Sequence, residues 1–224
     1  MKRRYNLLIR FLLTAILMFT VGLASIKIPV SGTSSALTLT DEASIILNGA
    51  FQSGDLVLDD IEVASGSFTR LHFQGFHLSN IIGNPELPEM HRLIELPQNA
   101  IPRIEVIDEE IEYYNLRDYG INSFIYPHQP SLSKSQDPND VPFKWNEALY
   151  QTDSYISPEL ISVEIKGMLR AVRVANLVIR PVDYNPQSGI LKVWKNITFN
   201  IHFDDADLIA TEELKAKYYS PYFE

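Results

Sequence analysis

The chain has 224 residues, of which 46% are apolar and 21% are charged, so it has the composition of a folded globular protein. It contains no cysteine, which excludes a disulfide scaffold, a thiolate metal site and a thiol nucleophile. The formal net charge is −9, and because residues 1–24 hold four basic side chains and no acid, the remainder carries −13 and disfavours a nucleic-acid partner.

Residues 1–24 have the pattern of a cleaved signal peptide. A basic start is followed by 14 uncharged residues from Phe11 to Ala24, and Gly22 and Ala24 are the small residues that a signal peptidase prefers. A helix of that length is about 21 Å long, which is shorter than the roughly 30 Å hydrocarbon core of a membrane. We therefore expect export, with no stable membrane span once residues 1–24 have been removed.

The segment 25–40 is rich in Ser and Thr and has no clear period, which predicts a flexible lead-in. From Asp41 onwards, short runs of Val, Ile, Phe and Tyr are separated by Gly, Pro, Asn and Asp, which is typical of β-strands. The predicted strands are Asp55–Val63, Gly66–Phe76, Glu89–Leu96, Arg103–Tyr114, Leu160–Pro181 and Ile190–Phe203, and a short surface helix is predicted within Ala206–Lys217. These elements predict an all-β domain over residues 41–205, an antiparallel β-sandwich or jelly-roll-like fold, followed by a junction segment over residues 206–224.

The C-terminal part of this domain shows two kinds of strand. Within Ile190–Phe203 apolar and polar residues alternate, which indicates a strand with one buried and one solvated face. Within Met168–Ile179 apolar residues occupy both parities, which predicts a central strand covered on both faces. Because Tyr184–Gly189 between them has turn chemistry, we predict a long C-terminal antiparallel hairpin.

The sequence lacks the usual strings of an enzyme or metal site. No H-E-x-x-H, G-x-S-x-G or phosphate-binding glycine loop occurs, and the odd spacing of His72 and His77 places them on opposite faces of a strand. Consecutive acids such as Asp108–Glu110 are typical of a solvated face. We therefore predict no catalytic residue, no metal and no cofactor, and keep a hydrolase that uses Ser and His as an alternative.

One segment combines unusual features. Tyr126–Pro142 holds four prolines, which forbid a helix and reduce the entropy lost when the segment is held in one shape. Near its centre a single cation, Lys134, is flanked by Ser133 and Ser135. The segment is either an ordinary surface loop or a preorganised, substrate-like loop that offers Lys134 to an acidic pocket of a partner.

Several short motifs in fixed order resemble the propeptides of gingipain-type cysteine peptidases, which Gram-negative bacteria secrete. The similarity covers roughly Glu42 to Phe203. It is carried by Gly83–Pro88, Arg92–Pro97, Gly167–Arg173, Ile179–Pro186 and Gly189–Trp194.

This resemblance implies a β-sandwich pro-domain that keeps a cysteine endopeptidase latent and assists its folding or secretion. It implies that Lys134, between Ser133 and Ser135, is the inhibitory residue that enters the specificity pocket, and that Lys215 or Lys217 is a maturation cleavage site. The implied partner is a gingipain-type peptidase domain, in cis or in trans, and the implied location is secreted, periplasmic or at the cell surface. This chain itself is expected not to be an enzyme.

An alternative from another class is a secreted adhesion or glycan-binding β-sandwich, because the chain has 11 Phe, 11 Tyr and 2 Trp. It predicts exposed aromatic side chains in a platform around Trp145 or Trp194, whereas scattered aromatic residues disfavour it.

Overall fold

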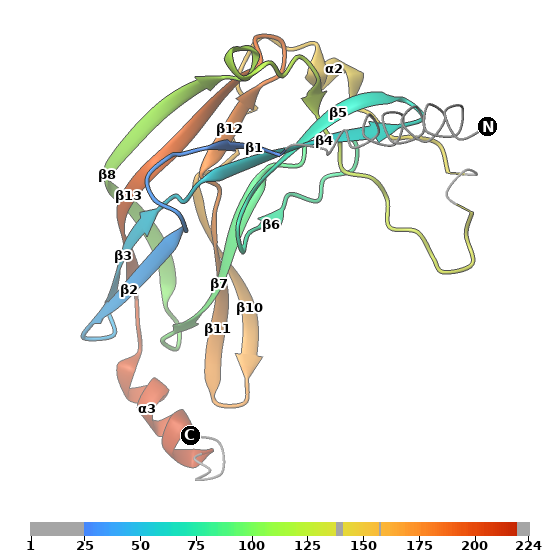
Figure 1. Cartoon of the computed structure of the whole chain (residues 1–224). Coiled ribbons are helices and arrows are strands. Elements are labelled where there is room, and N and C mark those ends of the chain that lie inside the picture. The colour runs from blue at the N-terminus through green and yellow to red at the C-terminus, as the bar shows by residue number, and fades with distance from the viewer. Residues whose placement is uncertain (1–24, 138–140, 157, 219–224) are drawn as a thin grey trace, which may run out of the picture.

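The computed structural model describes residues 25–137, 141–156 and 158–218, so the predicted signal peptide lies outside the described residues. Strands dominate this part of the chain (Figure 1). They are β1 (Ile26–Ile28), β2 (Ala36–Glu42), β3 (Ile46–Gln52), β4 (Leu56–Val63), β5 (Gly66–Phe73), β6 (His77–Leu78), β7 (Pro88–Leu96), β8 (Ile101–Asn115), β9 (Phe124–Ile125), β10 (Ile161–Leu169), β11 (Val172–Ile179), β12 (Val182–Asn185) and β13 (Ile190–Asp204). The helical elements are a 3-10 turn (Leu116–Tyr119), α2 (Glu147–Tyr150) and α3 (Leu208–Lys217). No helix within the described ranges has the length and apolarity needed to cross a membrane.

The 15-residue strand β13 organises the largest sheet. β8 pairs antiparallel with it from end to end, so that Ile190 lies opposite Asn115 and Asp204 lies opposite Ile101. On the other side of β13, first β12 and then β3 pair with successive halves of the strand, and β2 extends the sheet beyond β3. The alternation predicted for β13 is confirmed, because its apolar side chains are buried: Leu191, Val193, Ile197, Phe199, Ile201 and Phe203.

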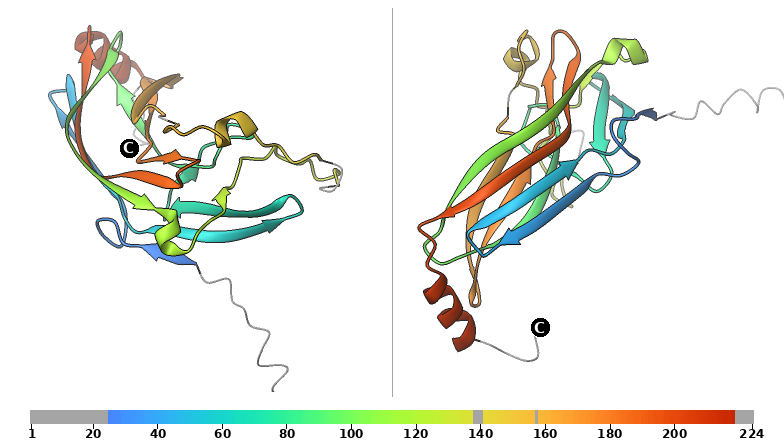
Figure 2. Two further views of the ribbon diagram at one scale, coloured as in Figure 1. Left: turned by 90° about the horizontal axis from the view of Figure 1, so that it is seen from above. Right: turned by 90° about the vertical axis from the view of Figure 1, so that its left-hand side faces the viewer.

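Two smaller sheets pack against this one, in the orders β10–β11–β7–β6 and β1–β4–β5–β9. Their neighbouring strands are antiparallel, except that β9 runs parallel to β5. Figure 2 shows both sheets facing the curved β13 sheet, in the two-layer arrangement of a sandwich. The predicted all-β, sandwich-like class is confirmed.

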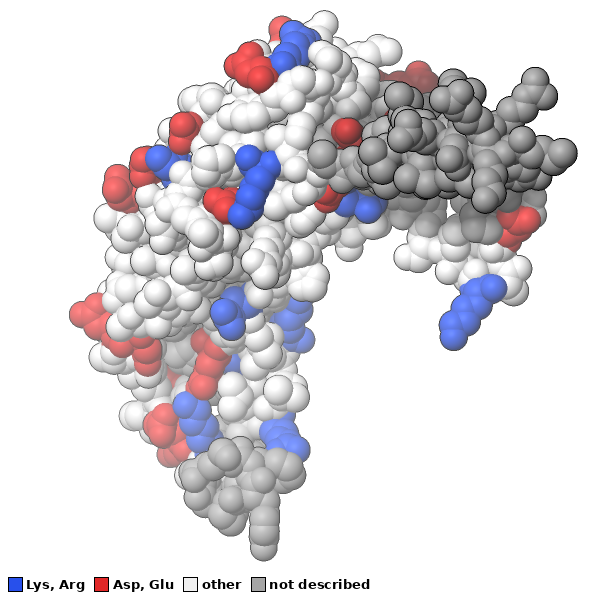
Figure 3. Space-filling model, in the orientation of Figure 1, with Lys and Arg blue, Asp and Glu red and all other residues white. Residues whose placement is uncertain are grey.

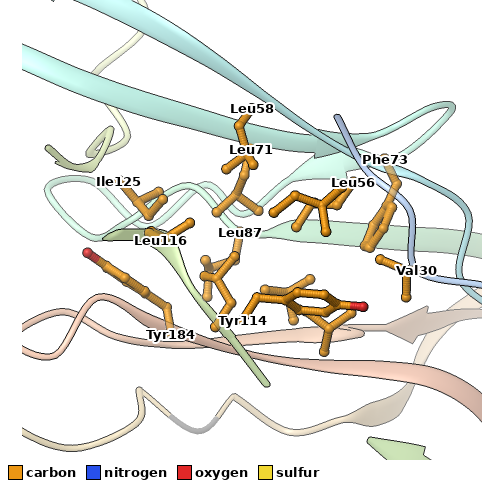
Figure 4. Close-up of a cluster of buried hydrophobic side chains, with 14 of the residues drawn as sticks. Val30, Leu56, Leu58, Leu71, Phe73, Leu87, Tyr114, Leu116, Ile125 and Tyr184 are labelled. Atoms are coloured by element: carbon orange, nitrogen blue, oxygen red, sulfur yellow. The ribbon is translucent and has the colours of Figure 1, made fainter. Parts of the chain in front are cut away.

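Each smaller sheet forms its own hydrophobic core with the β13 sheet. In the first core Leu71 and Phe73 of β5 point toward Tyr114 of β8 and Tyr184 of β12 (Figure 4). The second core joins β7 and β11 to the other end of β13 and includes Leu177 and Phe199, both fully buried. Because burial of one such apolar side chain is worth roughly 1.5–3 kcal/mol, these two cores make the main favourable contribution to holding the three sheets together.

Two parts of the predicted organisation differ from the structure. The segment expected to be a flexible lead-in contains β1 and most of β2, because Ile28 and Val30 are buried in the first core. The C-terminal hairpin at Tyr184–Gly189 is present, but its first strand is the four-residue β12. β11 lies in another sheet, since the chain crosses between the sheets at Pro181, which has no N–H to continue a ladder.

The molecule has the outline of an arch. Figure 1 shows one limb that carries β7, β10, β11 and α3, and a second arm that carries β4, β5 and the segment that follows β9. Figure 3 shows the surface hollowed between these two parts. The proline-rich segment is therefore displayed at one end of the molecule, and α3 lies at the other (Figures 1 and 2).

Candidate functional site

Lys134 lies in the exposed part of the proline-rich segment, which we name the Lys134 loop and define as residues 129–137. The Gln136 N–H donates to the Ser133 carbonyl at 3.1 Å, which makes a turn with Lys134 at its second position. Ser133, Lys134 and Ser135 are all exposed, and the two serine hydroxyl oxygens lie 3.4 Å apart. The ammonium group is therefore presented to solvent at a turn. Residues 138–140, which follow the loop, lie outside the described residues.

The base of the loop is closed by one side chain. The Gln129 amide donates from Nε2 to the Lys144 carbonyl at 2.8 Å and accepts at Oε1 from the Lys144 N–H at 2.9 Å. The same Nε2 also donates to the Pro127 carbonyl at 2.9 Å. The amide thus joins the segment before the loop, at Gln129, to the segment after it, at Lys144. The two bonds resemble those between paired residues of two β-strands.

A tight turn, residues 81–84, is hydrogen-bonded to the segments on both sides of the loop, at His128 and at Asn146. The Gly83 N–H donates to the His128 carbonyl at 2.8 Å, and the Gly83 carbonyl accepts from the Asn146 N–H at 3.0 Å. Asn84 adds a backbone bond from the His128 N–H at 2.9 Å and a side-chain bond from Asn146 at 2.9 Å. Gly83 has φ +82°, and a Cβ there would lie 3.2 Å from the Asn146 nitrogen, so both its conformation and its space favour glycine.

A buried carboxylate holds the first flank. Glu86 is 7% exposed, and its two oxygens pair with Arg70 Nε at 3.0 Å and with His128 Nδ1 at 2.9 Å. The Arg70 guanidinium also lies 4.9 Å from the centre of the Tyr126 ring. A buried carboxylate is costly unless it is paired, so both ion pairs of Glu86 are expected to be maintained. Through them Glu86 connects Arg70 of β5 to His128 at the start of the loop.

Aromatic rings fill the space under the loop. Phe68 of β5 packs against Tyr126, Phe143 and Trp145, with centroid distances between 5.3 and 5.8 Å. Tyr150 of α2 packs 5.0 Å from Trp145 and donates its hydroxyl to the Ile125 carbonyl at 2.6 Å; burial raises its pKa above the ordinary value. Most of these rings pack with edges against faces, whereas Phe68 and Phe143 are tilted by 34°, and the cluster supports the loop from below.

The aromatic residues do not form the open platform that a glycan-binding site predicts. Trp145 takes part in the packed cluster, although Phe124, Trp145 and Tyr150 also line a cavity of about 430 Å³. Trp194 is 7% exposed, its indole N–H donates to Glu109 at 2.8 Å, and Lys192 covers its ring at 4.3 Å. Trp194 therefore presents no exposed flat face on which a sugar could stack, and Trp145 is half-buried within the packed cluster.

The two candidate cleavage residues lie in α3, far from the Lys134 loop (Figure 1). Lys215 is within the helix, and its ammonium is 2.7 Å from Glu95 of β7 and 3.7 Å from Glu212. The hydrogen bond to Glu95 raises the pKa of Lys215. Lys217 is the last residue of the helix and is exposed.

Four of the five histidines and several acidic residues are engaged in structural pairs. His72, His91, His128 and His202 each lie beside a carboxylate, at distances from 2.7 to 3.5 Å. Within residues 25–137, 141–156 and 158–218, no group of three His, Cys, Asp or Glu side chains is placed to hold a metal ion. The consecutive acids of β8 pair with β13, where Glu110 accepts from Lys195 at 3.0 Å and from Asn196 at 2.6 Å.

The Lys134 loop and its central cation could be identified from the sequence, but the residues that hold the loop could not. Gln129 and Asn146 belong to no motif, and Glu86 lies in the string Gly83–Pro88 without a role assigned from the sequence. Each bonds to a residue that is distant in sequence, by 15 positions for Gln129, 42 for Glu86 and 62 for Asn146. The one signal in the sequence is the string Gly83–Pro88, which supplies Gly83, Asn84 and Glu86 to the support of the loop.

This chain is similar in sequence to one protein family and to several known proteins. The profile of the family described as Propeptide_C25 matches residues 35–216. Lys-gingipain from Porphyromonas gingivalis is 36% identical over 215 residues, which cover 95% of this chain and 12% of that protein. Gingipain R2 from the same organism is 22% identical over 152 residues, which cover 66% of this chain and 19% of that protein. The chain therefore spans about an eighth of the length of the Lys-gingipain that it matches.

Two solved structures have the same fold. One, from a study of the zymogenic latency of gingipain K from Porphyromonas gingivalis, superposes with a TM-score of 0.76 at 34% identity and covers 82% of this chain and 100% of that one. The other, from a complex of the pro- and mature domains of Porphyromonas gingivalis RgpB, has a TM-score of 0.65 at 16% identity and covers 82% of this chain and 96% of that one. At that lower identity the second likeness concerns the fold alone.

Proposed function

The chain belongs to the gingipain propeptide family, Propeptide_C25, and from this premise we propose that it keeps a gingipain-type cysteine peptidase inactive by placing Lys134 in the specificity pocket of the peptidase. It is a propeptide without cysteine, so it does not supply the nucleophile of that peptidase. The observation that carries the proposal is the exposed Lys134 at the turn of a loop whose two flanks are bonded to each other.

The chemistry of a lysine side chain suits this role. An ammonium group loses its water when it enters a pocket, and this is favourable only when a carboxylate pairs with it there. The loop therefore selects a peptidase that cleaves after basic residues. The 36% identity to Lys-gingipain supports a lysine preference of the partner.

The rigidity of the loop explains how a substrate-like segment would inhibit. A flexible peptide with a lysine is cut and leaves, because its backbone adjusts to the attacking nucleophile. Here Gln129 and the turn 81–84 hold both flanks, so little freedom is lost on binding and the ends stay together. The loop binds well and reacts slowly for the same structural reason.

The same proposal covers partner and location. The solved complex of RgpB pro- and mature domains supports a peptidase domain as the binding partner of this chain, in cis within a precursor or in trans. The pattern of residues 1–24 supports export, and the propeptide family is compatible with a secreted, periplasmic or cell-surface location and with assistance in folding the peptidase.

The test compares inhibition of a Lys-gingipain by the purified exported protein and by its Lys134→Ala variant. We expect the inhibition constant to rise by about 30-fold or more, because truncating a buried charged partner costs at least roughly 2 kcal/mol. The matched control is Lys144→Ala, since Lys144 is also exposed and contributes only backbone atoms to the loop closure. Equal inhibition constants for the native protein and Lys134→Ala would contradict the proposal that Lys134 occupies the specificity pocket.

A further inference from the structure

We propose that Ile81 and Ile82 form a second contact with the same peptidase domain, an apolar anchor beside the Lys134 loop. This inference rests on the proposed function, because it names a further part of the surface that meets the partner. Both side chains are large and apolar, yet they are 62% and 54% exposed. We name these two residues the isoleucine pair.

The isoleucine pair stands on a rigid support. The Asn84 N–H donates to the Ile81 carbonyl at 3.0 Å, which closes the four-residue turn 81–84. Gly83, the next residue after the pair, has φ +82° and is bonded to His128 on one side and to Asn146 on the other. The pair is therefore held out toward solvent by the backbone, and it loses little freedom when a partner covers it.

The position of the pair determines which partner covers it. The turn contacts both flanks of the Lys134 loop, His128 before it and Asn146 after it, so the pair lies at the foot of the loop. A molecule that takes Lys134 into a pocket comes close to this foot. Ile81 also lines a cavity of about 700 Å³ that residues of β6, β7, β10 and β11 complete, next to the hollow seen in Figure 3.

The chemistry of the pair predicts the chemistry of its receptor. Two branched aliphatic side chains with no polar atom require an apolar recess that excludes water. The charged Lys134 gives selectivity for the acidic pocket, whereas the isoleucine pair adds affinity that does not depend on that pocket. Both contacts belong to one rigid body, so each raises the effective concentration of the other.

The first experiment measures the dissociation constant of the purified exported protein and its Ile81→Ser/Ile82→Ser variant on a Lys-gingipain. Loss of two anchors is expected to raise the dissociation constant by roughly 100-fold, about tenfold for each buried isoleucine. The matched control is Ile45→Ser/Ile209→Ser, since Ile45, in the turn between β2 and β3, is 46% exposed and Ile209, in α3, is 75% exposed. Both elements lie far from the Lys134 loop (Figure 1). This control is expected to bind as the native protein does.

A second measurement separates the anchor from the Lys134 contact. The peptidase is first treated with a small covalent inhibitor that fills its specificity pocket. Native protein and Lys134→Ala are then expected to retain the same weakened binding, and the double serine variant is expected to lose it. Equal binding of native and double serine variant to the open peptidase, while Lys134→Ala binds weakly, would overturn the anchor and leave the proposed function standing. The reverse pattern would overturn the role of Lys134 and leave the anchor.

A third comparison excludes other roles of the pair. Ile81→Leu/Ile82→Leu keeps the apolar surface and is expected to bind within a few-fold of the native protein, because volume-conserving apolar substitutions cost little. The melting temperature of the serine variant is expected to stay within a degree or two of native, because exposed substitutions change stability little. Concentration-dependent self-association of the free protein that the serine pair abolishes would instead assign the surface to a second copy of this chain.

Discussion

Gln129 and Lys144 are linked as two residues of a β-ladder are, although only one of them contributes its backbone: the Gln129 side-chain amide bonds to both the carbonyl and the N–H of Lys144, at 2.8 and 2.9 Å. The Gln129 side chain takes the place of a backbone partner for Lys144. The two flanks are therefore joined without a β-ladder that continues into the loop. The Lys134 turn can therefore protrude while its ends remain bonded.

Replacing Gln129 by Leu is expected to loosen the loop without unfolding the protein. Of the three bonds that the Gln129 amide makes, the two to Lys144 close the loop, and their loss is worth about 2 kcal/mol, which raises the population of the opened loop by roughly 30-fold. We expect a Lys-gingipain to cut the variant after Lys134 correspondingly faster, as measured by mass spectrometry of timed digests. Gln187→Leu is the control, because Gln187 is exposed and accepts a bond from Arg117 only at its backbone carbonyl, at 3.1 Å. A digest rate equal to that of the native protein would remove Gln129 from the closure of the loop.

Replacing Glu86 by Gln is expected to lower the stability of the whole protein. Arg70 and His128 would each lose a carboxylate partner in a partly buried place, at a cost of about 2–3 kcal/mol. The readout is the midpoint of urea unfolding, with the exposed Glu62→Gln as the control. An unchanged midpoint would mean that solvent replaces Glu86 without loss.

Stability is expected to fall at alkaline pH. Burial raises the pKa of Tyr184 to about 12 and also raises the pKa values of Tyr114 and Tyr150. A raised pKa means that folding favours the protonated phenol, so this contribution is complete below the ordinary pKa of about 10 and is lost as the pH rises toward 12. For Tyr184 alone the loss is about 3 kcal/mol, at 1.36 kcal/mol for each pKa unit. Urea midpoints measured between neutral pH and pH 12 check this.

The control for the pH experiment is Tyr184→Phe. This variant keeps the ring in the core and removes the titrating hydroxyl, so its urea midpoint is expected to fall less steeply above pH 10. Curves of equal slope for the variant and the native protein would contradict the assignment to Tyr184.

Cleavage near the C-terminus is expected after Lys217 rather than after Lys215. A peptidase needs an extended backbone, and Lys215 lies inside α3 with its ammonium bonded to Glu95, whereas Lys217 ends the helix. Limited digestion with a lysine-specific peptidase, followed by mass spectrometry, gives the order of the cuts. Glu95→Gln is expected to raise the rate after Lys215, and a first cut after Lys215 in the native protein would contradict the prediction.

Much of the fold could be predicted from residues that lie close together in the chain. The alternation within Ile190–Phe203 determines which face of β13 is buried. The central strand predicted within Met168–Ile179 is right for β11, which lies between β10 and β7, but wrong for Met168 and Leu169, which end β10 and are 49% and 59% exposed, because the predicted run Leu160–Pro181 is a hairpin of two strands. The prolines around Lys134 likewise indicate an exposed, non-helical loop, because each acts on its own backbone. The position of Lys134 at a solvent-exposed turn follows from this local chemistry.

The partners of these elements depend on tertiary structure. β13 lies between β8 and β3, and β3 is about 150 residues away along the chain. β11 lies in a different sheet from β13, and Ile28 becomes part of a core although its own segment has no strand period. The supports of the Lys134 loop are of the same kind: Gln129 binds Lys144, and Glu86 binds Arg70 and His128. Local sequence specifies the secondary structure of a segment and which of its faces is buried, because backbone propensity and side-chain alternation act within a few residues. Which segments meet is decided by burial of surface between parts of the chain that no short-range pattern connects.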